Sequence, residues 1–293
     1  VGVCSLHCNT ASNNTGVGFN SLLKNISGTE NTSLGAHALE DNTTADENVA
    51  VGFKSLFTNT TGTRNSALGY RTLCSNTTGG ANVALGNNAL FTNSTGDNNI
   101  GIGRDALFAN TTADNNTAVG FCSLAANTTG AKNIAIGSCA LQKNTTAGEN
   151  VGIGQQALQC NVTGIHNTGI GAGALLKNTD CRNVAIGYHS LLCNTSGESN
   201  TAIGYNSLDA NTTADSNTAI GKDSLTANTT GAANTAVGAY SLDSNTTGYA
   251  NTAIGCDALQ TNTAGFHNVA VGENSLELND SGDQNVAIGV AVL

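Results

Sequence analysis

Hydrophobic and polar positions alternate along the chain in one short pattern that repeats from end to end. Asn14, Asn31 and the asparagines that follow each begin a segment of 17 residues, except for one segment of 16 at Asn167. Sixteen complete copies lie between two partial ones. In the repeat, Asn occupies positions 1 and 12, an aliphatic residue position 4, Gly position 5 and Leu position 9, while positions 3 and 8 are nearly always small. A fixed short period over a whole chain predicts a solenoid of stacked coils.

Each copy contains two apolar pieces that predict short strands. The first is T-A-I, as at residues 201–203, and the second ends in Leu, as at residues 207–208. Gly at position 5 suits a turn with positive φ, and Gly or Ala near position 15 suits a second turn. The sequence therefore predicts an all-β fold, a parallel β-solenoid (β-roll) of about 17 coils with two short strands per coil. Residues 1–293 are expected to form one continuous domain.

Strand alternation predicts which side chains face the interior. Positions 2 and 4 share one face of the first strand, and we expect them to join Leu of position 9 in a narrow core. Val1 is the first of the position 4 aliphatic residues. Position 3 then points away, yet it stays small, which indicates that another backbone lies close by, either the opposite wall or a partner chain. Lateral association through Ala202 and Ala219 into a dimer or trimer is therefore a prediction.

The two Asn columns predict ladders along the solenoid axis. Asn side chains stacked at a turn can donate from each amide to the carbonyl oxygen of the neighbouring coil. Representatives of position 1 are Asn31, Asn48, Asn65, Asn200 and Asn217, and representatives of position 12 are Asn42, Asn59, Asn76, Asn211 and Asn228.

Position 12 also starts an N-x-[ST] sequon in most copies, so N-linked glycosylation is a rival interpretation. The ladder is favoured, because Asn9, Asn178 and Asn262 keep the Asn where the sequon is broken. Glycans on every coil, about 4.8 Å apart, would also collide. The glycosylation candidates, which rank below the ladder, include Asn25, Asn93, Asn161, Asn194 and Asn279.

Composition excludes several classes of function. With 10 Lys and Arg against 20 Asp and Glu, the net charge is −10, which argues against a nucleic-acid partner. No apolar run is long enough to span a membrane. The five His are scattered over the repeat positions, and no catalytic constellation, metal site or cofactor motif is present. We expect a protein that is not an enzyme and has no cofactor.

The nine cysteines carry a further set of predictions. Cys122 and Cys139 occupy the same column in adjacent coils, with Cα atoms about 4.8 Å apart, and are candidates for a disulfide. Cys4 and Cys8 share the first partial coil and are a second candidate pair. Cys256 lies near one end of the chain and is a candidate for a bond between subunits.

The repeat resembles two kinds of fibrous protein. The core Asn200-Thr201-Ala202-Ile203-Gly204-Tyr205-Asn206-Ser207 resembles the head repeats of trimeric autotransporter adhesins. The longer pattern at residues 225–238 looks like the repeats of bacterial and viral tail-fibre-type proteins. The resemblance covers the whole chain. It implies a β-roll that trimerises and binds host matrix or other surfaces.

These observations lead to one main functional hypothesis. The chain is expected to be a structural or adhesive fibre subunit or shaft segment, extracellular, on a cell surface or in a virion fibre. Its partner would be itself, laterally or end to end, since both ends stop inside a repeat. A surface glycan or host-surface ligand is a second possible partner.

Two other functions compete with the fibre hypothesis. The runner-up is an ice-binding solenoid that presents a Thr column such as Thr212, Thr229 and Thr246, although Ile26, Val162 and Asp280 interrupt this column. A glycan-binding module is the third reading, but Tyr70, Tyr188 and Tyr205 share a column only discontinuously.

Overall fold

The computed structural model describes residues 2–293; Val1 and its predicted place in the core lie outside the described residues. The contacts divide the chain into two compact units, Val1–Gly148 (unit 1) and Glu149–Leu293 (unit 2), and each is described by itself. The described part of the chain is all-β, and within it no long apolar helix of the kind that crosses a bilayer is present.

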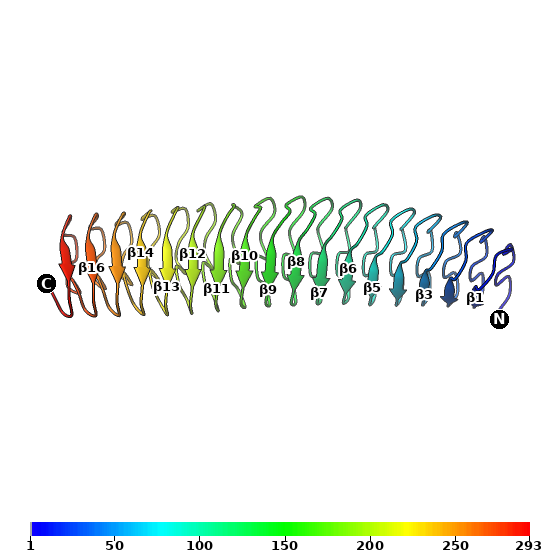
Figure 1. The fold of residues 1–293 in the computed structure, drawn as a ribbon, viewed down its shortest axis with the longest axis horizontal. Coiled ribbons are helices and arrows are strands. Elements are labelled where there is room, and N and C mark those ends of the chain that lie inside the picture. The colour runs from blue at the N-terminus through cyan, green and yellow to red at the C-terminus, as the bar shows by residue number, and fades with distance from the viewer. Residues whose placement is uncertain (1) are drawn as a thin grey trace. The chain divides into compact units, whose positions relative to one another are not determined.

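Unit 1 is a parallel β-solenoid with one three-residue strand per coil (Figure 1). Consecutive strands pair in parallel and in register, so that Thr15 lies opposite Thr32 and Val49 opposite Ser66. The strands are β1 (Thr15–Val17), β2 (Thr32–Leu34), β3 (Val49–Val51), β4 (Ser66–Leu68), β5 (Val83–Leu85), β6 (Ile100–Ile102), β7 (Thr117–Val119) and β8 (Ile134–Ile136).

Unit 2 repeats the same architecture. Its strands also pair with their sequence neighbours, as in Thr201 opposite Thr218. They are β9 (Val151–Ile153), β10 (Thr168–Ile170), β11 (Val184–Ile186), β12 (Thr201–Ile203), β13 (Thr218–Ile220), β14 (Thr235–Val237), β15 (Thr252–Ile254), β16 (Val269–Val271) and β17 (Val286–Ile288). The parallel β-solenoid predicted from the period is confirmed.

The predicted second strand is wrong. Positions 6 to 11 form turns, because the chain takes positive φ at position 7 and again at the Leu of position 9, as in Asp223 (52°) and Leu225 (52°). A residue other than Gly rarely adopts this left-handed conformation. Here a hydrogen bond between coils stabilises this conformation: the Leu225 N–H donates to the Ser241 carbonyl of the next coil at 3.0 Å. Gly at position 5 has φ between 126° and 143°, which confirms the predicted turn there.

The predicted inside and outside of the strand are exchanged. The middle residue of every strand, position 3, is buried, whereas positions 2 and 4 are partly or fully exposed. Ala202 and Ala219 are therefore core residues, with no exposed surface, and cannot form a contact with a partner chain. Position 3 is small because the Leu of the opposite wall lies against it: a Cβ added to Gly101 would lie 3.2 Å from the Leu90 Cγ.

The core thus consists of Ala or Gly at position 3, a small residue at position 8, Leu at position 9 and the two Asn columns. Leu208 and Leu225 are fully buried, and so are Asn200 and Asn211. With two Asn per coil in the interior, buried polar groups are as numerous as large apolar ones, so hydrogen bonding between coils is part of the packing.

The single 16-residue repeat leaves the strands in register. Thr168 pairs with Val184, and the missing residue falls in the loop that follows Asn178. There the Asp180 carbonyl accepts from both Asn167 Nδ2 (2.7 Å) and Asn178 Nδ2 (2.6 Å), as the position 15 carbonyl does in other coils. The shorter loop therefore keeps the hydrogen bonds that join the two Asn columns.

Candidate functional site: the outer face of the sheet

The outer face of the sheet, formed by the side chains of positions 2 and 4, is the most regular surface in each unit. Both positions alternate with the buried position 3, so that each strand presents two outward side chains. Many are exposed aliphatic residues, among them Leu34 (48% exposed), Leu68 (48%) and Ile254 (42%). No repeat copy has a charged residue at position 2 or 4.

In unit 1 this face contains an apolar groove over β3 to β5. The groove has a volume of about 330 Å³ and runs between the two outward columns. Val49 and Val83 line one side, Leu68 and Leu85 the other. An uncovered groove of this kind favours contact with another flat apolar surface.

In unit 2 the same face carries a row of Thr hydroxyl groups, one on each of four consecutive strands, which we call the hydroxyl rank. Thr201, Thr218, Thr235 and Thr252 are consecutive at position 2 of β12 to β15 and pair in register. Within the described residues, none of these four hydroxyls has a hydrogen-bond partner in the chain. Ile203, Ile220, Val237 and Ile254 form the parallel column at position 4.

The Thr column predicted as an ice-binding array is at position 13, outside the sheet, and its hydroxyls are engaged in hydrogen bonds between coils. The hydroxyls of Thr212 and Thr229 each donate to the position 13 carbonyl of the next coil at 3.1 Å, and that of Thr246 does so at 3.0 Å. These hydroxyls therefore help to join the coils, and their protons are engaged.

Both Asn ladders are present, with different hydrogen-bonding patterns. At position 12, Asn59 Nδ2 donates to Asn42 Oδ1 at 3.1 Å, and Asn76 Nδ2 donates to Asn59 Oδ1 at 2.8 Å. At position 1 the backbone N–H also donates to the Oδ1 of the preceding coil, as from Asn48 to Asn31 (3.0 Å). Nδ2 of Asn48 donates to the same Asn31 Oδ1 at 3.2 Å and to the Gly62 carbonyl at 3.0 Å. The same bonds join Asn65 to Asn48, Asn217 to Asn200 and Asn228 to Asn211.

The glycosylation candidates belong to the position 12 ladder. Asn25, Asn93, Asn161 and Asn194 are fully buried, and Asn279 is half-buried. Nδ2 of Asn93 donates to Asn76 Oδ1 and to the Gly96 carbonyl, both at 2.9 Å. Because a glycan is attached through Nδ2, it would have to displace these bonds from the interior. Modification of the folded chain at these sites is physically incompatible with the ladder.

The predicted disulfides are not formed. The five cysteines of these predictions are free thiols, Cys4, Cys8 and Cys256 being exposed and Cys122 and Cys139 half-buried. In-register parallel stacking separates the Cβ atoms of neighbouring coils by the same distance of about 4.8 Å as the Cα atoms. A disulfide needs a Cβ separation of about 3.5–4.5 Å, so a shared column does not by itself form the bond.

The thiols of Cys122 and Cys256 have raised pKa values. Burial is the main cause for Cys122, followed by the charge of Asp105. At Cys256 the main cause is a hydrogen bond from Sγ to Asp257 Oδ2 at 3.1 Å. Since the thiolate is the reactive form, Asp257 makes Cys256 less reactive toward a second subunit.

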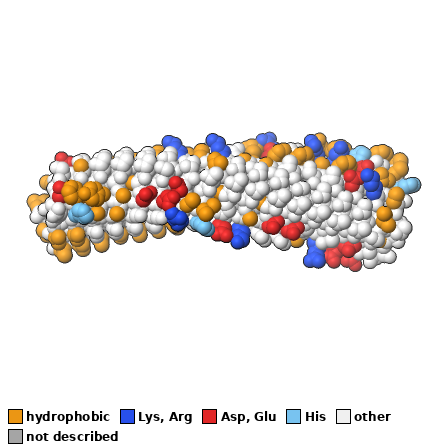
Figure 2. All heavy atoms as spheres, turned by 90° about the horizontal axis from the view of Figure 1, so that it is seen from above, with side chains coloured by type: hydrophobic (Ala, Val, Ile, Leu, Met, Phe, Trp, Pro, Cys, Tyr) orange, Lys and Arg blue, Asp and Glu red, His pale blue; other side chains and the backbone are white. Residues whose placement is uncertain are grey.

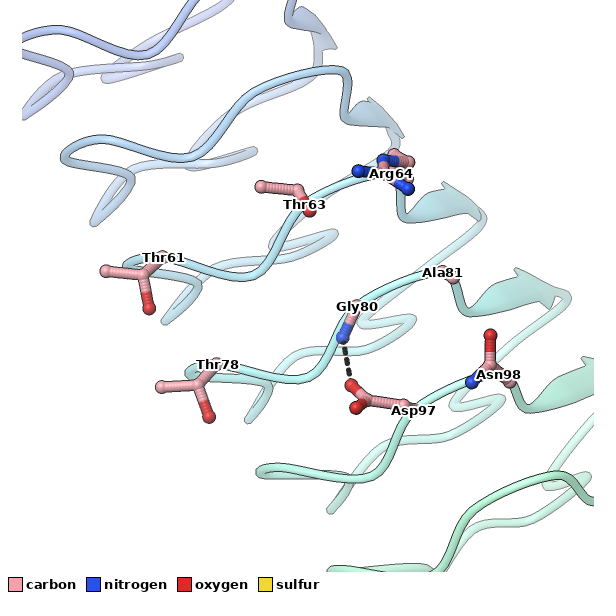
Figure 3. Close-up of a pocket in the computed structure, with 8 residues that line it drawn as sticks. All are labelled: Thr61, Thr63, Arg64, Thr78, Gly80, Ala81, Asp97 and Asn98. Atoms are coloured by element: carbon pink, nitrogen blue, oxygen red, sulfur yellow. Dashed lines mark hydrogen bonds between the residues drawn. The ribbon is translucent and has the colours of Figure 1, made fainter.

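A polar hollow of about 280 Å³ lies on the loop edge of unit 1 (Figure 3). It forms where Gly80 and Ala81, which carry no long side chain, lie in the coil between that of Arg64 and that of Asp97. Asp97 Oδ1 accepts from the Gly80 backbone N–H at 2.7 Å, and Arg64 is paired with Glu47 at 3.4 Å. These charges are engaged in holding coils together, which leaves the hollow without free charged groups aimed into it.

Ionisable side chains do not converge elsewhere. In the described part of the chain, no group of three or more His, Cys, Asp or Glu side chains has metal-site geometry. His37 pairs with Glu40 at 2.5 Å and His166 with Glu149 at 2.8 Å. Charged side chains are sparse among uncharged polar side chains and backbone on the face shown in Figure 2.

Comparison with known proteins adds no relative: no family model matches the chain, and no curated protein is significantly similar to it. The fold is that of a repetitive structural protein, and function has to be argued from the surfaces of the coils.

Proposed function

We propose that the chain is a subunit or shaft segment of an extracellular structural or adhesive fibre, in which a second copy packs on the outer sheet face. One observation carries this proposal. Positions 2 and 4 face outward in every coil, and they are never charged, whereas the outward positions 7, 16 and 17 carry many charges. An exposed aliphatic face without charge is typical of a surface that is covered in the assembled state.

A second copy fits this face in spacing, although the area of unit 2 alone supports only weak pairing. Both copies present side chains at the same interval of about 4.8 Å, so two faces can interdigitate over their length. The nine strands of unit 2 form a strip about 40 Å long. At a width of about 10 Å, pairing through unit 2 would bury about 800 Å² in total, which is below the about 1,200 Å² of a stable specific contact and is the size of a weak, transient one. Pairing is therefore expected to depend on protein concentration.

Sedimentation velocity of the full chain tests the proposal. Ile203→Glu with Ile220→Glu places two charges on the outer face, and Thr213→Glu with Thr230→Glu places the same two charges on exposed loop positions as a control. We expect the wild type and the control to form dimers or fibres and the Ile203/Ile220 variant to remain monomeric. A wild type that stays monomeric at every concentration, or equal masses for all three proteins, would contradict lateral pairing.

The hydroxyl rank of unit 2 favours ice binding as a second candidate. Thr218 and its three neighbours combine free hydroxyls with an adjacent aliphatic column at a regular spacing, which is the combination that the predicted column at Thr212 lacks. Thermal hysteresis distinguishes the two functions. Activity that is lost in Thr218→Tyr and kept in Thr213→Tyr would support ice binding, and absence of hysteresis in the wild type would exclude it.

A further inference from the structure

The turn after the strand in unit 1 carries two basic side chains in adjacent coils. Lys54 and Arg71 both occupy position 7, with φ of 55° and 54°. Arg71 N–H donates to the Phe53 carbonyl at 2.9 Å, which fixes the register of the two coils. Their Cα atoms are therefore about 4.8 Å apart. We call Lys54 and Arg71 the basic ridge.

The basic ridge has no acidic counterpart within the chain. Among the ten Lys and Arg, Lys54 and Arg71 are the one pair that shares a repeat position in adjacent coils. Across the described residues, no carboxylate lies within salt-bridge distance of either, although Lys24 pairs with Asp41 at 2.7 Å. Like charges placed side by side in neighbouring turns repel each other. An anion from outside the chain would remove this repulsion.

Aromatic rings hold both cations in place. Lys54 Nζ lies 4.8 Å from the centroid of the Phe57 ring, and Arg71 Cζ lies 4.5 Å from that of Phe91. Cation–π contacts of this kind fix the position of a charge without neutralising it. The two charges are thus preorganised for a ligand.

Phe53 and Tyr70 add exposed apolar surface directly beside the basic ridge. They occupy position 6 of the same two coils, with ring centroids 5.5 Å apart and planes at 17°. Their exposed fractions are 40% and 48%. One face of each ring is stacked on the other ring.

We propose that the basic ridge, with Phe53 and Tyr70, binds an acidic polysaccharide built of sulfated or uronate sugars. The two cations match the negative charges of such a chain, and the rings match the apolar C–H surface of a sugar. A single-stranded nucleic acid fits less well, because successive bases stack on a row of aromatic rings, and position 6 carries Ala36 and Asn87 in the coils on either side of Phe53 and Tyr70. This proposal is independent of lateral pairing.

Titration calorimetry of the full chain with heparin and with polygalacturonate tests this site. The variant is Lys54→Gln with Arg71→Gln. The control, Arg64→Gln with Lys132→Gln, removes the same charge from position 17 on another edge of unit 1. We expect the wild type to bind at least one polysaccharide, the ridge variant to lose at least about tenfold in affinity, and the control to change by less than about twofold. Tyr70→Ser, which keeps both charges, should lower the affinity several-fold while its melting temperature stays near that of the wild type.

Three outcomes would overturn the proposal. Absence of polysaccharide binding by the wild type would remove the site altogether. Equal losses in the ridge variant and the control would indicate general electrostatic attraction, and tighter binding of poly(dT) than of heparin would indicate a nucleic-acid ligand. Circular dichroism and melting of every variant separate loss of binding from loss of fold.

Discussion

Replacing one Asn of the position 12 ladder tests the account of the interior directly. In unit 2, Asn228 is fully buried. Its Nδ2 donates to Asn211 Oδ1 and to the Gly231 carbonyl, both at 3.0 Å, and its Oδ1 accepts from Asn245 Nδ2 at 2.9 Å. Asn228→Ala removes all three bonds and leaves the backbone of the coil unchanged.

The expected loss follows from the groups that remain. Asn211 Oδ1 and the Gly231 carbonyl lose this donor inside the protein, whereas Asn245 Nδ2 keeps its bond to the Gly248 carbonyl at 2.9 Å. An unsatisfied buried polar group costs about 1–3 kcal/mol, so two of them predict a loss of about 2–6 kcal/mol. For a unit of about 150 residues, each kcal/mol corresponds to about 2–4 °C, which places the fall in melting temperature at about 4–24 °C.

Thermal unfolding followed by circular dichroism, together with urea titration, measures this loss. Thr230→Ala is the matched control, because it destroys the same N-T-T sequon at an exposed position and leaves the ladder intact. We expect Thr230→Ala to melt within about 1 °C of the wild type. A melting temperature of Asn228→Ala equal to that of the wild type, or an equal fall in Thr230→Ala, would refute the ladder as a source of stability. Intact mass measurement of the native protein reports any glycan.

Three further predictions follow from the coil geometry. Ala219→Glu places a charge in the closed core and is expected to abolish the folded state of unit 2, seen as loss of the native circular dichroism spectrum. Gly221 has a φ of 141°, and the Cβ added in Gly221→Ala would clash with the Gly238 carbonyl. We therefore expect urea titration to show a loss of at least about 3 kcal/mol in the free energy of unfolding. Asp243→Asn should raise the melting temperature at pH 7 but not at pH 3. Burial first, and then the charges of Asp223 and Asp257, raise the pKa of Asp243. The native state therefore binds this proton more tightly, and stability is lost as pH rises through the native pKa.

These three results have separate controls and contrary outcomes. Ala219→Ser should fold, since Ser occupies the same position in β2, and a folded Ala219→Glu would mean that position 3 is not enclosed. Gly169→Ala should be tolerated, because Gly169 has no positive φ, its added Cβ would meet nothing closer than 3.2 Å, and Ala occupies position 3 in other copies, as at Ala185. An Asp243→Asn variant that is no more stable than the wild type at pH 7 would show that the buried charge is fully compensated.

The repeat sequence predicts the stacking of the coils because a strict period leaves one register in which Asn, Gly and Leu all match their counterparts. It does not predict which face of the strand is inside, since period-2 alternation admits two solutions that differ by one residue. Placing the larger side chains of position 4 inside is the usual choice. It fails here because Leu of position 9 and the two Asn columns already fill a narrow interior. The signal that identifies the inner position is its size limit: position 3 is Ala, Gly or Ser in all complete copies.

The second error, the strand expected at the Leu of position 9, has a different origin. Leu225 is held at a φ of 52°, a conformation that its own propensity disfavours, by the inter-coil bond to Ser241. Local preference therefore cannot reveal it. The sequence does not reveal the basic ridge for the same reason, because only the observed turn at position 7 places Lys54 and Arg71 side by side, half-buried against Phe57 and Phe91.

The pattern of variation across the coils argues that the outer sheet face and the turn edge have different constraints. At position 7, residues as different as His37, Lys54, Asp105 and Tyr240 are accepted, so this outward position tolerates any side chain that can adopt positive φ. Positions 2 and 4 are equally outward, and strand propensity explains their β-branched residues but not the complete lack of Lys and Glu, which blunt exposed sheets in other proteins. Contact with water alone would not exclude charged residues from positions 2 and 4 while it accepts them at position 7. The contrast is expected if a surface without charge, such as a second copy of the same face, lies against positions 2 and 4.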